Sequence, residues 1–134
     1  DCTRHPNAIL GRSLRLESVQ NATDQAKTAA NTLCGKLESY HALPWFWSDQ
    51  FDLKLQTAGL WTGADQTVVR GDPGTRAFAV FYLKEGRIIA VDAVNSPPEF
   101  VVGKKLVAAK AKVAPGELVD KSISMKDIGA RASS

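Results

Sequence analysis

The sequence predicts an α+β fold in which an antiparallel meander of about four to five strands carries helices on one side. Three observations lead to this prediction. Segments with the two-residue alternation of strands are grouped between residues 51 and 94. Segments with helical spacing come before this group, at 18–35, and after it, at 98–112. Strands that follow one another directly, rather than alternating with helices, are typical of an antiparallel layer.

Residues 1–16 have the turn chemistry of a loop, and the first helix is expected after them. Ser18 is a suitable N-cap, and Gly35 is placed to end the helix. One face between them consists almost wholly of alanine, at positions 22, 26, 29 and 30. Because alanine is small, this face permits a closer approach to a sheet or a ligand than leucine would.

The strand pattern begins at Phe51, where apolar and polar residues start to alternate. A second short strand is expected at 67–70. Residues 77–83 and 88–94 are apolar on both faces, which predicts central strands. Glu85-Gly86 between them has the length and composition of a two-residue hairpin turn.

The run Asn95-Ser96-Pro97-Pro98 ends the predicted sheet, and a helix is expected over 98–112. Four lysines accompany this helix: Lys104, Lys105, Lys110 and Lys112. They permit two interpretations, the solvated face of an amphipathic helix or an electrostatic dock for an acidic partner. Pro115-Gly116 interrupts the pattern, and a last helical turn is expected at 124–129.

The composition argues against several classes of function. Seventeen basic residues are interspersed with fourteen acidic ones, for a formal charge of +3, so no nucleic-acid partner is expected. No apolar run reaches the ~20 residues of a membrane span. The cysteines Cys2 and Cys34 form neither a disulfide framework nor a metal cluster, so both are expected to be free thiols in a cytoplasmic protein.

No complete catalytic constellation is present in the sequence. Gly-x-Ser-x-Gly, His-Glu-x-x-His and glycine-rich phosphate loops are all absent, and the two histidines, His5 and His41, are isolated. The chain therefore does not have the pattern of a complete enzyme.

Two stretches are more informative, and each permits two interpretations. Trp45 and Trp47 flank Phe46 in the run "LPWFWSDQF" at 43–51, which suits either core packing or a surface on which a flat cofactor rests. Residues 14–22 lead into the alanine-rich helix. The start of a helix suits an anion or a carbonyl that gains negative charge, or it is simply a capped end within a core.

Together these stretches resemble the C-terminal part of the FAD-dependent, NADH-linked ferredoxin reductases of oxygenase systems, the family of putidaredoxin, rubredoxin and aromatic-dioxygenase reductases. The resemblance is carried by "DC" at 1–2, "RLESVQNATDQAKTAA" at 15–30, "PWFWSDQ" at 44–50, "VVRGD" at 68–72, "FYLKEGRIIAVDAVNSPPEF" at 81–100 and the "LVAAKAKV" helix that follows. These motifs span nearly the whole chain in the family's order.

The resemblance implies a division into three segments. Residues 1–36 would be the last loop and helix of an FAD-binding domain, 37–120 the reductase C-terminal α+β domain, and 121–134 a terminal turn and tail. The glycine fingerprints for FAD and NADH would lie in a part of the reductase that precedes Asp1, so the chain is not expected to be active alone.

The resemblance also implies a set of FAD-binding residues. Asp1 would bind the ribityl chain, and the backbone of Val19 would meet the pyrimidine end of the isoalloxazine. Trp47 would lie beside the flavin and face a docked iron–sulfur protein, while Trp45 packs in the interior. Glu17 is assigned to the same site, chiefly as the residue that holds the loop before the helix.

The implied function is electron transfer from NADH through FAD to a 2Fe–2S ferredoxin or a rubredoxin that feeds an oxygenase. This chain would supply the isoalloxazine and ribityl side of the FAD site and part of the docking surface for the acceptor. A non-catalytic dimerisation or interaction module, related to the C-terminal domains of flavoprotein reductases, is the alternative. No catalytic residue and no metal ligand is assigned to this chain, and no membrane partner is expected.

Overall fold

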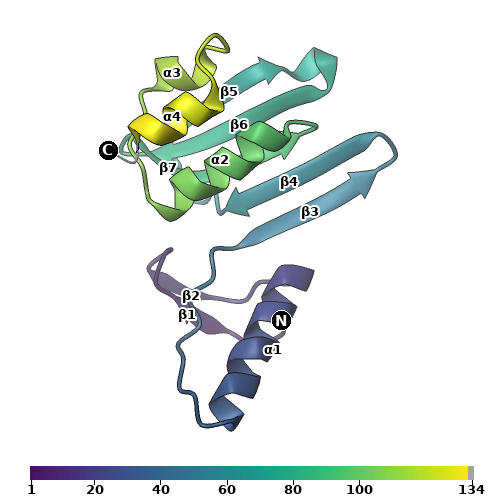
Figure 1. Ribbon diagram of the computed structural model, residues 1–134, viewed down its shortest axis with the longest axis vertical. Coiled ribbons are helices and arrows are strands. Elements are labelled where there is room, and N and C mark those ends of the chain that lie inside the picture. Colours follow the sequence, from purple (N-terminus) through teal and green to yellow (C-terminus); the bar gives the residue numbers. More distant parts are fainter. Residues whose placement is uncertain (133–134) are drawn as a thin grey trace. The chain divides into compact units, whose positions relative to one another are not determined.

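The computed structural model describes residues 1–132, which form two compact units divided after Phe46 (Figure 1). Each unit is described by itself below. The predicted terminal segment 121–134 includes two residues, 133 and 134, that lie outside the described part of the chain. The division into segments 1–36, 37–120 and 121–134 stays a prediction.

The first unit contains a short antiparallel hairpin where the sequence predicted only a loop. Strand β1 is His5–Asn7, and it pairs with β2, Arg12–Leu14. The Asn7 side chain accepts a hydrogen bond from the Leu10 N–H (3.0 Å), and the Asn7 carbonyl accepts one from the Gly11 N–H (2.9 Å), which closes the turn. Strands of three residues are too short for alternation to identify, so the prediction of a loop was wrong for a physical reason.

Helix α1, Val19–Leu33, lies where the sequence predicted it. The Ser18 hydroxyl accepts a hydrogen bond from the Asn21 N–H (3.1 Å), as expected of an N-cap. At the other end Cys34 is the C-cap, and Gly35 follows with a left-handed φ of 81°. Glycine is well suited to that conformation, so both predicted helix boundaries are confirmed.

The second unit is built on a five-stranded antiparallel sheet, as the sequence predicted. The strands are β3 (Trp45–Gln50), β4 (Leu53–Gly59), β5 (Gln66–Asp72), β6 (Ala77–Lys84) and β7 (Arg87–Val94). Their spatial order is β3-β4-β7-β6-β5, which differs from a simple meander because β7 pairs with β4 and β5 forms the far edge. Alternation identifies strands but not their partners, so this order depends on tertiary pairing.

Local sequence signals predict one turn of the sheet correctly, between β6 and β7, and miss another, between β3 and β4. Glu85 and Gly86 join β6 to β7 with φ values of 51° and 72°, the left-handed pair that a tight hairpin turn requires. Phe51, predicted to begin a strand, instead lies in the turn between β3 and β4, fully exposed and with φ 54°. Its apolar character continues the alternation of Leu53 and Leu55, but the chain reverses there.

Three helices cover one face of the sheet (Figure 1). Helix α2 (Pro97–Ala108) packs on β7, β4 and β6; α3 (Pro115–Val119) packs on β5; and α4 (Met125–Arg131) packs on α2. A Cβ added at Gly103 would lie 3.0 Å from a Val91 methyl, so glycine lets α2 approach the sheet closely. The prediction of helices on one side of an antiparallel sheet is confirmed.

The predicted helix over 98–112 ends earlier than its pattern suggested, at Ala108. The chain after the helix turns back to the sheet. There the Ile88 N–H donates to the Ala111 carbonyl (3.0 Å), and the backbones of Lys112 and Arg87 form an isolated antiparallel β-bridge. Pro115, expected only to interrupt the pattern, begins α3, because proline fits the first turn of a helix.

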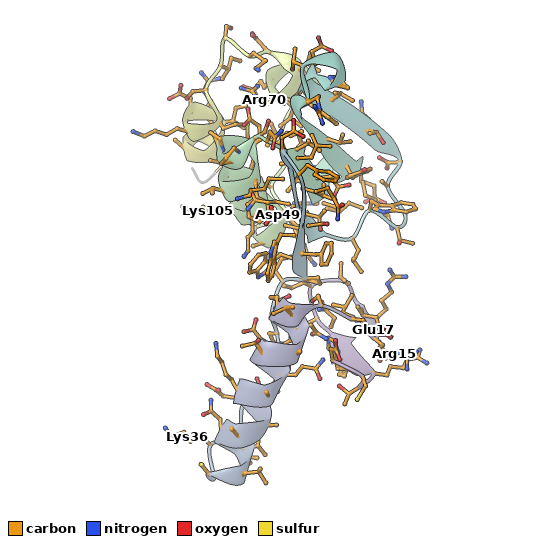
Figure 2. All side chains as sticks on the ribbon, turned by 90° about the vertical axis from the view of Figure 1, so that its right-hand side faces the viewer. Arg15, Glu17, Lys36, Asp49, Arg70 and Lys105 are labelled. Carbon is orange, nitrogen blue, oxygen red and sulfur yellow. The ribbon has the colours of Figure 1, made fainter. Side chains whose placement is uncertain are left out.

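The side chain of Arg70 on β5 holds the C-terminal helices against the sheet (Figure 2). Only 3% of it is exposed. Its guanidinium donates to the carbonyls of Leu118 (3.1 Å), Asp120 (2.8 Å) and Ile123 (2.7 Å), and it pairs with Glu99 at 3.3 Å. One buried cation therefore satisfies a carbonyl of α3 and two carbonyls of the connection between α3 and α4.

The Arg70→Met substitution should lower the free energy of unfolding by about 3 kcal/mol, because it leaves Glu99 and three carbonyls without a donor. Urea denaturation of the 134-residue chain measures this loss. Arg76→Met is the matched control, since Arg76 pairs with Asp52 at 2.9 Å on an exposed surface and should matter by less than about 1 kcal/mol. Equal losses in both variants would contradict the role given to Arg70.

Tyr82 and Asp92 form a hydrogen-bonded pair on the face of the sheet that the three helices leave uncovered. The Tyr82 hydroxyl donates to Oδ2 of Asp92 at 2.9 Å. Burial, aided by the hydrogen bond to Asp92 and its negative charge, raises the pKa of Tyr82 to about 12. Burial also raises the pKa of Asp92, and the hydrogen bond from Tyr82 opposes that shift.

Stability should therefore fall in alkaline solution. Folding raises the pKa of Tyr82 from 10.0 to about 12, so the unfolded chain releases this proton first as the pH rises. The contribution of Tyr82 is complete below about pH 10 and is lost by about pH 12. Urea denaturation across this range should show a smaller decline for Tyr82→Phe than for the natural chain, and identical slopes would refute the assignment.

Candidate functional site

A buried amide holds the chain where it enters α1. Asn21 is fully buried, and its Nδ2 donates to the Leu16 carbonyl at 2.5 Å. Its Oδ1 accepts from the Tyr40 hydroxyl (2.8 Å) and from Nε2 of Gln25 (3.2 Å). Every polar group of this side chain thus has a partner, and the backbone before α1 is held in one position relative to the helix.

A second amide connects the same helix to the aromatic stretch. Oε1 of Gln20 accepts a hydrogen bond from the Trp45 N–H (3.3 Å), while its Nε2 donates to Asp24 (2.6 Å) and approaches the Tyr40 hydroxyl (3.5 Å). Burial raises the pKa of Tyr40, and the hydrogen bond with Gln20 opposes that shift. Within the first unit, the start of α1 and the first residue of β3 are therefore held by one side chain.

The N-terminal segment is held beside the same helix. Nε2 of Gln25 donates to Nδ1 of His5 (3.1 Å), and the Thr3 hydroxyl donates to Oε1 of the Gln25 side chain. The His5 ring also meets the edge of Tyr40, with 4.9 Å between ring centroids. The N-terminal segment is thus attached to α1 through Thr3 and His5.

Three of the predicted FAD-binding residues, Asp1, Glu17 and Val19, lie in the first unit, and all are exposed. Glu17 pairs with Arg15 at 3.4 Å (Figure 2). Because both side chains of this ion pair are exposed, it contributes little to stability. The predicted roles of these three residues stay predictions.

Val19 is the first residue of α1, and 65% of it is exposed. The first N–H groups of a helix have no partner within the helix, and they carry a partial positive charge. The first turn of α1 contains no acidic residue, so its own side chains do not neutralise this charge. The start of α1 therefore keeps the electrostatic character that suits an anion or a polarised carbonyl.

Trp47 lies on β3, an edge strand of the sheet, and 38% of it is exposed. The neighbouring Trp45 is half-buried. Trp47 belongs to the second unit, whereas Asp1, Glu17 and Val19 belong to the first. A single site that includes all four residues stays a prediction.

The lysines singled out in the sequence are divided between two structural settings. Lys104 and Lys105 lie on α2, and Lys110 and Lys112 follow the helix. Between α2 and α4 lies a groove of about 300 Å³, lined by Val102, Lys105, Leu106, Ala109, Lys126, Gly129, Ala130 and Ala132. Both interpretations of the lysines, solvated helix face and acidic-partner dock, remain compatible with these positions.

Within residues 1–132, no three histidine, cysteine or acidic side chains gather into a group that could hold a metal ion. Both cysteines are exposed free thiols. Over the same residues, no helix combines the length and the apolar character that crossing a bilayer demands.

Sequence reasoning missed the residues that position the start of α1. It gave most weight to the alanines, yet within the first unit the polar side chains Gln20 and Asn21 are the buried residues of α1. A usable signal was present, since Gln20 and Asp24, like Asn21 and Gln25, are four positions apart and share a helix face. Polar residues at that spacing are usually solvated, so their burial depends on Tyr40, which is distant in sequence.

Comparison with known proteins identifies related chains. A family model described as "Reductase C-terminal" matches residues 45–129. A ferredoxin–NAD(P)+ reductase of Sphingomonas sp is 54% identical over 87% of this chain, and the match covers 28% of that protein. Putidaredoxin reductase of Pseudomonas putida is 43% identical over 98% of this chain and is covered to 31%.

A solved structure is similar over the whole chain. It is the covalent complex of putidaredoxin reductase with putidaredoxin, which matches with a TM-score of 0.92 and 42% identity. The match covers 100% of this chain and 32% of that one. The chain thus spans less than a third of the length of these relatives.

Removing the Asn21 side chain should loosen α1. In the Asn21→Ala variant, the Tyr40 hydroxyl and the Leu16 carbonyl lose their partner, so the free energy of opening α1 should fall by about 2 kcal/mol. Hydrogen exchange of the α1 amides measures this locally. Asn31→Ala is the control, since the Asn31 side-chain amide donates to Glu38 (2.9 Å) in an exposed setting, and faster exchange in both variants alike would count against the network.

Proposed function

The chain belongs to the reductase C-terminal family, and we propose that it is part of a flavoprotein that passes electrons from NADH through FAD to a 2Fe–2S ferredoxin or a rubredoxin feeding an oxygenase. The activity is that of the complete reductase, of which this chain supplies the isoalloxazine and ribityl side of the FAD site and part of the docking surface. The observation that carries the proposal is the similarity of the entire chain, at 42% identity, to putidaredoxin reductase in a complex with putidaredoxin.

The start of α1 fits the pyrimidine end of a flavin. The first N–H groups of a helix carry a partial positive charge, and the first turn of α1 has no acidic residue, which suits the negative charge of a reduced isoalloxazine. A helix terminus stabilises such a charge by about 0.3–1 kcal/mol, and by more where water is excluded. Val19 would present its backbone to the ring, and Asp1 would accept hydrogen bonds from the ribityl hydroxyls.

When bound, FAD supplies the conversion between hydride transfer and single-electron transfer, and this chain supplies its orientation. Asn21 holds the backbone that leads into Val19, and Gln20 holds the start of the strand that carries Trp47. Glu17 would lie in the loop before α1, where its exposed ion pair with Arg15 adds little rigidity. The contacts of Asn21 and Gln20 give Val19 a rigid support within the first unit, which a binding site requires.

Trp47 would shield the flavin on the side of the electron acceptor. Its indole is partly exposed on an edge strand, where a partner protein has access to it. Interfaces between redox partners are usually small and weak, so one aromatic side chain can carry much of the contact. Lys105 and Lys126, which line the groove between α2 and α4, would suit an acidic acceptor.

We place the reductase in the cytoplasm. Its two exposed thiols, Cys2 and Cys34, would remain reduced there.

In the complete reductase, Trp47→Ala should slow electron transfer to the iron–sulfur acceptor by about tenfold while leaving flavin reduction by NADH nearly unchanged. The reason is that the indole contacts the acceptor rather than the nicotinamide. Stopped-flow absorbance separates the two half-reactions. Phe51→Ala, which removes a fully exposed aromatic ring from the turn after β3, should leave both rates unchanged. Equal slowing of both half-reactions by Trp47→Ala would remove the docking role.

The 134-residue chain by itself should bind FAD about a thousandfold more weakly than the complete reductase, because the adenine and pyrophosphate contacts lie elsewhere. Titration of the chain with FAD, followed by flavin fluorescence, gives the dissociation constant. The complete reductase titrated after removal of its flavin is the reference. Comparable affinity in the two proteins would mean that the FAD site had been assigned to the wrong residues.

A further inference from the structure

Tyr40 lies in the segment between α1 and β3, and its hydroxyl is bound to the start of α1. Residues 34–39 are all exposed, whereas Tyr40 is half-buried. Its hydroxyl donates to Oδ1 of the buried Asn21 (2.8 Å) and lies 3.5 Å from Nε2 of Gln20. Both amides belong to the first turn of α1, directly after Val19. The hydroxyl of a residue distant in sequence therefore helps to hold the first turn of this helix.

The ring of the same tyrosine contacts a different element, the N-terminal strand β1. The rings of Tyr40 and His5 are steeply inclined to each other, with 4.9 Å between their centroids and 76° between their planes. His5 is the first residue of β1 and is only 8% exposed. At the other end of β1, Nδ2 of Asn7 donates to the Ala42 carbonyl (3.4 Å). The segment around Tyr40 thus holds β1 at both of its ends.

Four side chains form a closed loop of contacts, and we call them the Tyr40 cluster: His5, Asn21, Gln25 and Tyr40. Gln25 supplies the two contacts that complete the loop, since its Nε2 donates both to Oδ1 of Asn21 (3.2 Å) and to Nδ1 of His5 (3.1 Å). In a closed loop no member can move without disturbing two of its neighbours, so the members support one another. The cluster therefore couples the N-terminal segment to the start of α1.

The hydrogen bonds of the cluster also fix the tautomer of His5. Oε1 of Gln25 accepts from the Thr3 hydroxyl, so Nε2 of Gln25 faces His5. Nδ1 of His5 is consequently the acceptor, and the ring proton lies on its Nε2. That Nε2 is buried and has no hydrogen-bond partner within residues 1–132. A buried donor in this state lowers stability, so His5 is kept in place by its other contacts in the cluster.

We propose that Tyr40 is a positioning residue of the FAD site, which holds the segment of Asp1 and the start of α1 at Val19 in one fixed relation. The inference rests on the proposed function, in which Asp1 binds the ribityl chain and Val19 meets the pyrimidine end of the same flavin. Because the ribityl chain and the ring belong to one molecule, a shift between the two elements moves the ring relative to the first N–H groups of α1. Tyr40 acts through Asn21 and His5, which hold these two elements.

The consequence for the flavin is electrostatic. The N–H groups at a helix start favour the negative charge of a reduced flavin over the neutral oxidised ring. When the Tyr40 cluster is opened, the ring is held less firmly at those groups, and this preference weakens. The flavin then becomes harder to reduce, so its midpoint potential becomes more negative, and its binding becomes weaker.

Tyr40→Phe in the complete reductase tests this role, because it keeps the ring and removes only the hydroxyl. The midpoint potential of the flavin should become more negative, and the Kd for FAD, measured by fluorescence titration, should rise about fivefold. Tyr82→Phe is the matched control, since it removes a hydroxyl that donates to Asp92 (2.9 Å) in the second unit, and it should leave both quantities unchanged. Equal changes in the two variants would overturn the inference. An unchanged potential in Tyr40→Phe would also overturn it, even if Tm fell, because Tyr40 would then be merely structural.

A double-mutant cycle tests whether the cluster is closed. His5→Phe keeps an aromatic ring beside Tyr40 but removes the acceptor for Gln25, so it opens the same loop of contacts at another place. Once the loop is open, a second substitution has less to disturb. The change in log Kd for FAD in the double variant should therefore be smaller than the sum of the two single changes. Additive changes would overturn the coupling.

Hydrogen exchange in the 134-residue chain measures the coupling without FAD. Tyr40→Phe should speed the exchange of amides both in β1 and in the first half of α1, because the cluster joins these two elements. Faster exchange in α1 alone would overturn the inference, since the N-terminal segment would then be held independently of Tyr40.

These outcomes are separate from those that test the proposed function. A complete reductase of natural sequence that holds no FAD, or that reduces no iron–sulfur acceptor, would overturn the proposed function. A natural reductase that does both, while Tyr40→Phe leaves its flavin potential unchanged, would overturn only the role given to Tyr40.

Discussion

The position of the backbone at the start of α1 depends on one fully buried amide. Asn21 binds the Leu16 carbonyl on one side and Tyr40 and Gln25 on the other, so the loop, the helix and the segment at residue 40 are held together by a single side chain. Buried polar networks of this kind are strong only when every group has a partner. The exposed residues proposed to meet FAD, Val19 above all, take their positions from this network.

In the second unit, short helices are held against a sheet. Helices α3 and α4 are too short to be stable by themselves, and Arg70 secures the connection between them through three carbonyls. The guanidinium does so from β5, at the far edge of the sheet from β3. The sheet therefore offers an aromatic edge strand at one side and a helix layer on one face.

Much of this architecture could be predicted from local signals. Ser18 and Gly35 bound α1, the left-handed pair Glu85 and Gly86 joins β6 to β7, and residues apolar on both faces form the two central strands. The errors have different origins. The hairpin of β1 and β2 is too short for any period, and Phe51 continues an alternation across a turn, so both of these errors are local. The helix that begins at Pro97 stops early because Ala111 pairs with Ile88, which is distant in sequence.

By itself the sequence determined the kind of each long element and the family resemblance, because periodicity, caps and turn residues act over a few positions. Only the tertiary structure decided the strand order, the burial of Gln20 and Asn21 near Tyr40, the hydrogen bonds of Arg70 to the C-terminal segment, and the pairing of Tyr82 with Asp92. These features are set by which surfaces meet when the chain is compact, and no short stretch of sequence contains both partners of such a contact.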